Sequence, residues 1–251
     1  MKSLLSALQF LTIIPVKIKH VQEKQIARAL IYFPIIGLFL GLILLVFERM
    51  LYILNFGQFS INTILVVLLI ILTGGIHLDG SSDTVDALSS RKNKEEMLKI
   101  MRDSHIGVMG VLSLISIILL KISFLSSLNT VLRPTALLIM CILSRWSMVL
   151  AIFSFAYARE EGKAKVFFQG INLKIFLLST LITMGCVMFI WKLKGLAILG
   201  IILLSTYLIA KSLKNKIGGL SGDTLGAINE LNEVIILCVM AITAKIFLWI
   251  I

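Results

Sequence analysis

The sequence predicts an all-α, polytopic integral membrane protein made of one transmembrane domain, residues 1–251. Of the 251 residues, 59% are hydrophobic, and the mean hydropathy is +1.03. Soluble globular proteins are only about 45–50% apolar. Apolar runs long enough to cross a bilayer recur along the chain. No polar stretch exceeds about 30 residues, so the composition gives no sign of a separate soluble domain.

We expect about seven transmembrane helices, preceded by a short N-terminal helix lying along the membrane interface. In that first segment, Leu4, Leu8 and Leu11 recur at helical spacing. The expected spans are residues 29–47, 59–78, 106–125, 135–157, 175–191, 195–210 and 234–250. Because some of these runs are short or interrupted, six or eight spans also agree with the sequence.

Charge predicts which segments face the cytoplasm. The segments expected inside hold 17 lysines and arginines, whereas the expected outside turns hold 5. These inside segments are residues 1–28, 79–105, 158–174 and 211–233. Twelve of the thirteen Asp and Glu residues lie there too, and acidic residues contribute little to topology. The acids therefore indicate an active site at the cytoplasmic face. The basic excess suits topology and lipid headgroups, and there is no basic soluble domain to bind nucleic acid.

The stretch GGIHLDGSSDTVDALSSR, residues 74–91, brings Asp79, Asp83 and Asp86 together after the second expected span. Spacings of four and three place these carboxylates on one helix face, where like charges repel. A Mg²⁺ ion would offset this repulsion, since it binds one or two carboxylates together with substrate phosphates. Gly75 and Gly80 would let a ligand approach the backbone closely. The plainer alternative is that Asp79 caps the helix while the others face water.

Two arginines are candidates for binding an anion. Arg102 precedes the third expected span and can hold a phosphate through two hydrogen bonds. Arg145 lies in the middle of the apolar run CILSRWSMVLAI, where a charge is costly unless it faces a cavity or a partner. For Arg145, a structural salt bridge and an anionic substrate are equally compatible with the sequence.

A second acidic group follows the turn GGLSG and contains Asp223, Glu230 and Glu233. Such a turn can hold an anion at a helix N-terminus, or it can be a flexible loop before a solvated helix. Residues 81–87 and 221–227 both read S-x-D-T-x-x-A after a Gly-Gly pair. This echo suggests two half-sites facing one cavity, although so short a match can arise by chance.

Taken in order, these motifs resemble the cobalamin synthase family, also called adenosylcobinamide-GDP ribazoletransferase. The family signature GG-x-H-L-D-G-x-x-D-T-x-D stands at residues 74–86. Further stretches similar to the family are FLTIIPV, RALIYFPIIGLFLG, MLKIMRDSHIG, the Ser144–Arg145 pair, YAREEG and GGLSGDTLGAINEL. This chain departs from the family in having Ile13, Ser81, Ser82, Ala87 and His105 at their positions.

The resemblance implies a Mg²⁺-dependent, multi-pass transferase of the cytoplasmic (inner) membrane. Its substrates would be adenosylcobinamide-GDP and α-ribazole or α-ribazole 5′-phosphate, and GMP would leave. A second copy of the chain or other cobalamin-assembly enzymes are possible partners, besides the lipid bilayer. The implied roles are Mg²⁺ binding by Asp79, Asp83, Asp86 and Asp103; phosphate binding by Arg102 and Arg145 near Gly75 and Gly80; and catalysis by Asp83, Asp223 and Glu230.

Three other classes fit the sequence less well. CDP-alcohol phosphotransferases need Ala-Arg after their first acidic cluster, whereas TVDALSSR follows Asp83 here. The acidic motifs of membrane prenyltransferases lack the flanking glycines. A transporter should carry ionisable residues throughout its spans, whereas in this sequence Arg145 is the one that lies deep in an expected span.

Overall fold

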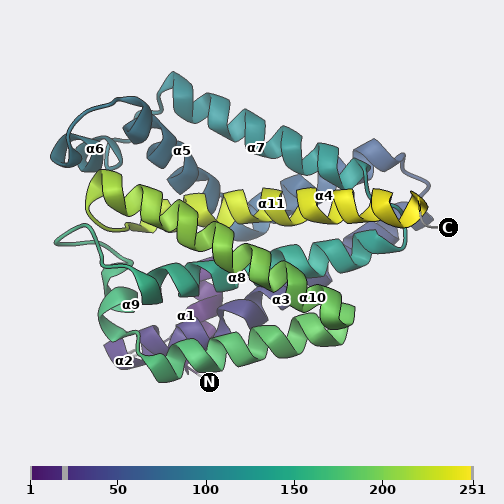
Figure 1. The fold of residues 1–251 in the computed structure, drawn as a ribbon, viewed down its shortest axis with the longest axis horizontal. Coiled ribbons are helices and arrows are strands. Elements are labelled where there is room, and N and C mark those ends of the chain that lie inside the picture. Colours follow the sequence, from purple (N-terminus) through teal and green to yellow (C-terminus); the bar gives the residue numbers. More distant parts are fainter. Residues whose placement is uncertain (1, 19–21, 250–251) are drawn as a thin grey trace.

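The computed structural model describes residues 2–18 and 22–249, and the side chains up to residue 243 (Figure 1). It is built from helices. These are α1 Lys2–Leu11, α2 Glu23–Ala27, the 3₁₀ helix η1 Arg28–Tyr32, α3 Phe33–Ile53, α4 Gln58–Thr73, α5 Ile76–Ser89, α6 Lys94–Ile100, α7 Val108–Ser126, α8 Leu132–Ser154, α9 Lys165–Gly170, α10 Leu173–Ile217 and α11 Gly222–Trp249. The predicted all-α class is confirmed.

Several of these helices could cross a membrane. Within the described residues, five segments are long and apolar enough, and α4 with α5 makes a sixth if that bent pair is one span. The five are α2–α3 taken together, α7, α8, α10 and the part of α11 up to Thr243. A polytopic membrane protein fits this pattern, while the number seven stays a prediction.

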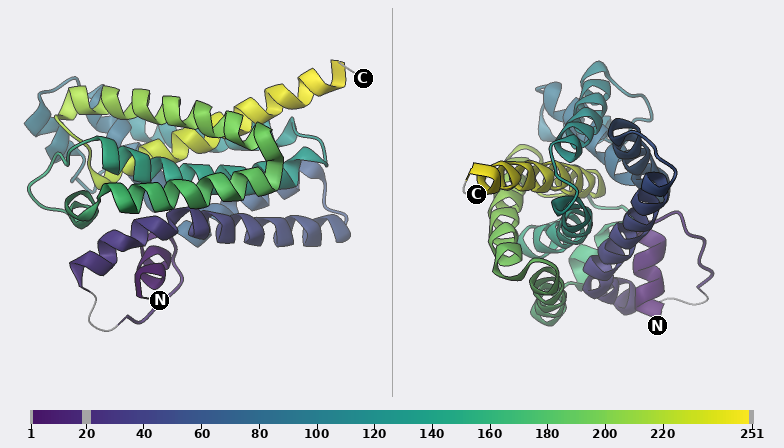
Figure 2. Two further views of the ribbon diagram at one scale, coloured as in Figure 1. Left: turned by 60° about the horizontal axis from the view of Figure 1, so that its bottom comes forward. Right: turned by 90° about the vertical axis from the view of Figure 1, so that its right-hand side faces the viewer.

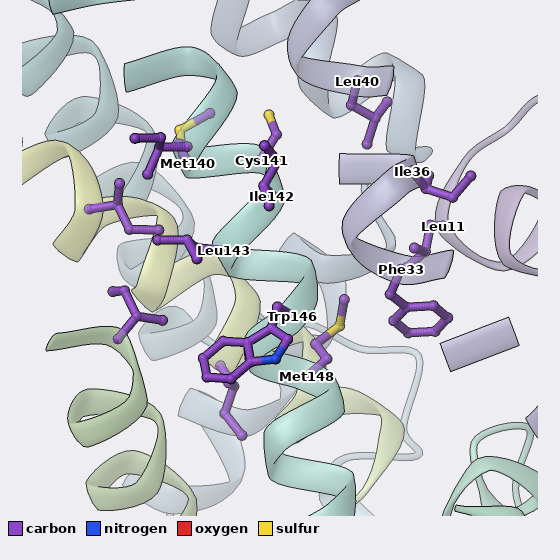
Figure 3. Close-up of a cluster of buried hydrophobic side chains, with 14 of the residues drawn as sticks. Leu11, Phe33, Ile36, Leu40, Met140, Cys141, Ile142, Leu143, Trp146 and Met148 are labelled. Atoms are coloured by element: carbon purple, nitrogen blue, oxygen red, sulfur yellow. The ribbon is translucent and has the colours of Figure 1, made fainter. Parts of the chain in front are cut away.

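Helix α8 forms the centre of the bundle, with α3, α10 and α11 packed around it. Nearly every side chain from Ala136 to Ile152 is buried, which explains why this run is apolar on all sides. Figure 3 shows Leu143 and Trp146 projecting from α8 on one side, and Ile36 and Leu40 of α3 on the other. The Trp146 indole donates to the Thr180 hydroxyl of α10 at 3.1 Å. The central helix thus packs against α3, α10 and α11 on several sides.

The second predicted span, residues 59–78, is wrong at its end, because α4 stops at Thr73. Gly74 and Gly75 follow with φ values of 63° and 67°, a left-handed conformation that glycine adopts without a steric penalty. The chain turns there by 90° into α5. The aspartates therefore stand on a separate helix that crosses the direction of the span before it.

Of the last two elements, α10 breaks between its two predicted spans, as expected, and α11 starts earlier than predicted. Helix α10 includes both predicted spans 175–191 and 195–210, but its backbone is non-helical at Trp191 and Lys192. At that break the chain folds back, so α10 forms two legs (Figure 2). Helix α11 begins at Gly222, twelve residues before the predicted start at 234. Glu230 and Glu233 consequently lie inside a membrane-length helix and not in a cytoplasmic loop.

The two ends of the bundle differ in content. Helices α6 and α9 and the α10–α11 connection lie at the left end of Figure 1, and the α3–α4 and α7–α8 turns lie at the right end. At the right end, the buried Arg133 Nε contacts Glu48 Oε1 at 2.8 Å and ties α8 to α3. Helix α1 does not rest on lipid alone, because Ala7 and Leu11 are fully buried against the protein. The motif-bearing segments predicted to be cytoplasmic thus gather at one end.

Candidate active site

Helices α5 and α11 cross in direct backbone contact, and this crossing brings the two echoing motifs together. A Cβ atom on Gly80 would lie 2.8 Å from the Cα atom of Asp223, and one on Gly226 would lie 2.8 Å from the carbonyl oxygen of His77. Only glycine permits so close an approach at both positions. The helices that carry the two echoing motifs are therefore in contact, while the idea that the motifs form two half-sites of one cavity stays a prediction.

The segment after α8 places an arginine at this crossing. The Ala158 amide donates to the Leu220 carbonyl at 2.8 Å, and the Leu220 amide donates to the Ala156 carbonyl at 2.9 Å. This short ladder holds the next residue, Arg159, so that its guanidinium pairs with the Asp223 carboxylate. The sequence prediction omits Arg159. The YAREEG motif contains Arg159 and could have indicated it, but without Asp223 beside it the motif resembles an ordinary charged turn.

A cavity of about 220 Å³ opens beside this pair. Asp79 and Asp223 reach it from α5 and α11, and Arg159 and Tyr157 reach it from the segment after α8. Its other lining residues include Phe10, Ile76, His77, Met148, Lys163, Ala164, Gly222 and Leu225. Burial raises the pKa of the Tyr157 hydroxyl, so it stays protonated near neutral pH. Two carboxylates and an arginine thus face a small, mostly apolar space.

A second, polar groove adjoins the cavity and shares Arg159 with it. Its basic side chains are Lys94, Lys99, Arg102 and Arg159. Glu95, Glu160 and Glu161 line the groove as well, so that three carboxylates stand among its four cations. Four cations along one groove are suited to phosphate groups, because guanidinium and ammonium groups form strong charge-assisted hydrogen bonds with them. The predicted phosphate ligand Arg102 therefore lies in the groove that adjoins the cavity, with its side chain exposed.

The three aspartates of α5 have different surroundings. Asp79 is exposed at the cavity and Asp83 is half-buried one turn further on. Asp86 accepts hydrogen bonds from the backbone amides of Gly107 and Gly110, each at 2.7 Å. It thereby satisfies the free N–H groups at the N-terminus of α7. One helix does carry all three carboxylates, but Asp86 also fixes the position of α7.

Asp103 stands apart from the other acids. Its carboxylate contacts His105 Nδ1 at 2.6 Å in an exposed loop. That side-chain hydrogen bond lowers the pKa of Asp103 and raises the pKa of His105. Within the described residues, no three His, Cys, Asp or Glu side chains are placed to bind one metal ion together. The predicted four-carboxylate shell is therefore not gathered. The set that remains close to the cavity is Asp79 and Asp83, with Asp223 across the helix crossing.

Arg145 and Glu230 belong to a different cluster, buried among α7, α8 and α11. Lys121 Nζ contacts Glu230 Oε2 at 2.6 Å and also pairs with Glu233, and Glu233 pairs with Arg145. All four side chains are nearly or fully excluded from solvent. For Arg145 this is the salt bridge that the sequence left open as one alternative. Neither Arg145 nor Glu230 lines the cavity beside Asp79.

This cluster corrects two inferences drawn from the sequence. Lys121 lies within α7 and not in a turn, and Glu230 and Glu233 lie buried within α11 and not in a loop. The argument that Arg145 is the one deep charge is therefore wrong. The deep charges nevertheless neutralise one another, two acids against two bases. Membrane proteins accommodate ionisable groups in their interior by such pairing. The paired charges of this cluster therefore fit a structural role better than an ion pathway.

Comparison with known proteins decides the family. Residues 3–241 match the family model described as cobalamin-5-phosphate synthase. The chain belongs to that family. A relative from Caldanaerobacter subterraneus subsp. tengcongensis is 40% identical over 238 residues, covering 94% of this chain and 96% of its own. Relatives from Desulforamulus reducens and Roseiflexus sp. are each 36% identical and cover 92% and 95% of this chain, and 92% and 88% of their own.

These three relatives are each named adenosylcobinamide-GDP ribazoletransferase. No solved structure matches the chain. Membership of the cobalamin-5-phosphate synthase family confirms the resemblance seen in the motifs. It also removes the CDP-alcohol phosphotransferase, prenyltransferase and transporter alternatives. The match covers every segment that contributes to the cavity and the basic groove.

Proposed function

We propose that this protein is an adenosylcobinamide-GDP ribazoletransferase acting in the assembly of the cobalamin nucleotide loop. It would join adenosylcobinamide-GDP to α-ribazole or α-ribazole 5′-phosphate and release GMP. The family and the names of its relatives support this reaction. The observation that carries the proposal is the meeting of Asp79, Asp223 and Arg159 at one cavity, beside a groove of four cations.

The reaction is a displacement at phosphorus. The 3′ oxygen of the ribazole ribose forms a bond to the cobinamide-linked phosphorus, the bond from that phosphorus to the GMP oxygen breaks, and the 3′-hydroxyl loses its proton. A 5′-phosphate on the nucleoside stays in place. Catalysis of such transfers is mainly positioning and charge neutralisation. Arg102, Lys94 and Lys99 would hold the diphosphate. Asp223 lines the cavity and is oriented by its ion pair with Arg159, so we assign it the role of accepting this proton.

We propose Mg²⁺ as the cofactor, held by Asp79 and Asp83. Their spacing of one helical turn suits an ion that binds one or two protein carboxylates and takes its other ligands from phosphates and water. Bound there, Mg²⁺ would polarise the phosphate and stabilise the leaving group. The further predicted ligands Asp86 and Asp103 already hold the α7 N-terminus and His105. The roles predicted for Arg145 in phosphate binding and Glu230 in catalysis gain no support from their positions.

The test measures product in isolated membranes that contain the full chain. Adenosylcobinamide-GDP and α-ribazole are supplied with Mg²⁺ or with a chelator, and GMP and the cobalamin product are quantified. We expect product with Mg²⁺ and none after chelation. If neither product forms at any metal concentration, the transferase assignment is wrong. If product still forms after chelation, the transferase assignment stands and the Mg²⁺ assignment is wrong.

A carboxylate variant sharpens the metal assignment. Asp83→Asn keeps the size of the side chain but removes its charge, and we expect turnover to fall by at least about a hundredfold, with the protein still folded in detergent. Glu96→Gln is the matched control, because Glu96 is exposed at the same end of the molecule and lines neither the cavity nor the groove. Near-normal turnover of Asp83→Asn would show that Asp83 is not a ligand of the metal ion.

A further inference from the structure

One part of the wall of the cavity beside Asp79 is apolar and aromatic, while His77, Arg159 and Lys163 line the rest together with the acids. Phe10 packs edge-on against Phe167 with ring centres 4.7 Å apart, and Tyr157 packs against Phe168 at 5.0 Å. Met148 adds a flexible, polarisable surface to the same cavity. Pockets of this composition bind flat apolar groups, because aromatic rings offer large contact areas with little loss of entropy.

The charged residues of the cavity come from neighbouring segments. Asp79 and Asp223 meet at the α5–α11 crossing, and Arg159 pairs with Asp223 there. A ligand that fits must therefore be amphipathic, with a flat apolar body and one polar end that meets the acids. A nucleoside with an apolar base has this form.

The volume of the cavity limits the occupant. At about 220 Å³ it is smaller than the roughly 300–1,000 Å³ of pockets that enclose drug-sized ligands. A corrin ring is far larger than such ligands and cannot enter. One heterocyclic base can.

The polar groove next to the cavity has the opposite character. Lys94, Lys99 and Arg102 line it together with Arg159, which also reaches the cavity. The groove can bind a diphosphate directly through these cations, whereas a phosphate beside Asp79 needs the Mg²⁺ ion proposed there to offset the repulsion between like charges. The two hollows thus differ in the part of a substrate that each can accept.

Three bases enter this reaction: the guanine and the adenine of adenosylcobinamide-GDP, and the benzimidazole of α-ribazole. Guanine and adenine present hydrogen-bonding groups along their edges, and each such group loses free energy when it is buried without a partner. The benzimidazole base of α-ribazole is largely apolar and has one free ring nitrogen. Tyr157 is a protonated donor on the cavity wall, and it can satisfy one acceptor.

We propose that the cavity lined by Phe10, Met148 and Tyr157 seats the base of α-ribazole, and that the groove lined by Lys94, Lys99 and Arg102 takes the diphosphate of the other substrate. This assignment rests on the proposed transferase function. It directs the ribose of the nucleoside toward Asp79 and Asp223, where the 3′ oxygen must react.

A substitution that fills the cavity tests the assignment. A Cβ atom on Gly222 would have Ala164 Cβ as its nearest neighbour, at 3.7 Å, which is ordinary contact. Gly222→Leu therefore places a side chain next to the bound base without a backbone collision. Gly200→Leu is the matched control, because Gly200 is exposed and a Cβ there meets nothing within 4 Å among the described residues.

We expect Gly222→Leu to raise the KM for α-ribazole, and its Kd in equilibrium dialysis, by about tenfold or more. The KM for adenosylcobinamide-GDP should stay within about twofold, as should both constants in Gly200→Leu. A rise confined to adenosylcobinamide-GDP, or competition by GDP for the α-ribazole site, would assign the cavity to guanine and overturn the proposal. Unchanged constants would overturn it too. Absence of product from the wild type would instead refute the transferase function.

Base size provides a second measurement if Gly222→Leu fails to fold. Gly222→Ala adds one methyl group, and nucleosides with an unmethylated benzimidazole base are compared with α-ribazole in the same membranes. We expect the alanine variant to shift its preference in kcat/KM toward the smaller base by several-fold. An unchanged preference would show that the base does not occupy this cavity.

Discussion

At the scale of single residues, the identity of a partner decides whether a charge is catalytic or structural. Asp223 and Glu230 lie seven residues apart in the same helix. Asp223 lines the cavity and pairs with Arg159, whereas Glu230 is buried with Lys121. Sequence spacing treats both as candidates for catalysis. The structure separates them by placing one at a surface that substrate can reach and the other in the packed interior.

Glu230→Gln distinguishes these roles. The substitution leaves Lys121 with Glu233 as its acidic partner and replaces a charged hydrogen bond by a neutral one. We expect a loss of about 1.5–3 kcal/mol in stability, visible as a lower Tm in detergent, with kcat within about threefold of the wild type. A large loss of kcat at unchanged Tm would instead place Glu230 in the reaction. Glu96→Gln, an exposed carboxylate, should change neither quantity.

At the scale of helices, apolar length and charge predicted where spans lie but not how they meet. Helices α7 and α8 begin and end within three residues of their predicted bounds, because continuous apolar runs mark them. The bend after Thr73 was missed because apolar residues continue past it, and its glycines were read as access for a ligand. The start of α11 was missed because Glu230 and Glu233 resemble loop residues until Lys121, more than a hundred positions away, is seen beside them.

The same limit applies to the site. The sequence identified Asp79, Asp83, Asp223 and Arg102, which the fold gathers near one cavity and one groove. It could not identify Arg159, because the value of that residue depends on a backbone ladder between segments about 60 positions apart. Roles that depend on local pattern were predictable, and roles that depend on tertiary contact were not.

The crossing of α5 and α11 is the contact on which the site depends most. Gly226→Leu would force a side chain into the His77 backbone, where a Cβ already lies 2.8 Å from the carbonyl oxygen. We expect a loss of about 1–3 kcal/mol in stability and a greater fall in turnover than in the control Gly185→Leu, where a Cβ meets nothing within 4 Å. If both variants keep normal Tm and turnover, the helices do not approach so closely.

At the scale of the whole molecule, the basic and acidic segments of the site share one end of the bundle (Figure 1). Two of the five basic residues assigned to outside turns, Lys121 and Arg133, are buried in ion pairs. Removing them leaves Arg49, Lys192 and Lys194 for the opposite end. The charge bias across the molecule is therefore stronger than the sequence count suggested, and it favours a site that faces the cytoplasm.

Cysteine labelling tests that orientation. In a chain whose three cysteines are replaced by alanine, Ser104→Cys lies at the site end and Gly57→Cys lies in the α3–α4 turn at the other end, and both positions are exposed. We expect an impermeant maleimide to label Gly57→Cys in intact spheroplasts and Ser104→Cys only after permeabilisation. The reverse pattern would put the site on the side of the membrane opposite the cytoplasm. Since the charged groove must meet a substrate that cannot cross the bilayer unaided, that result would contradict the site as well as the orientation.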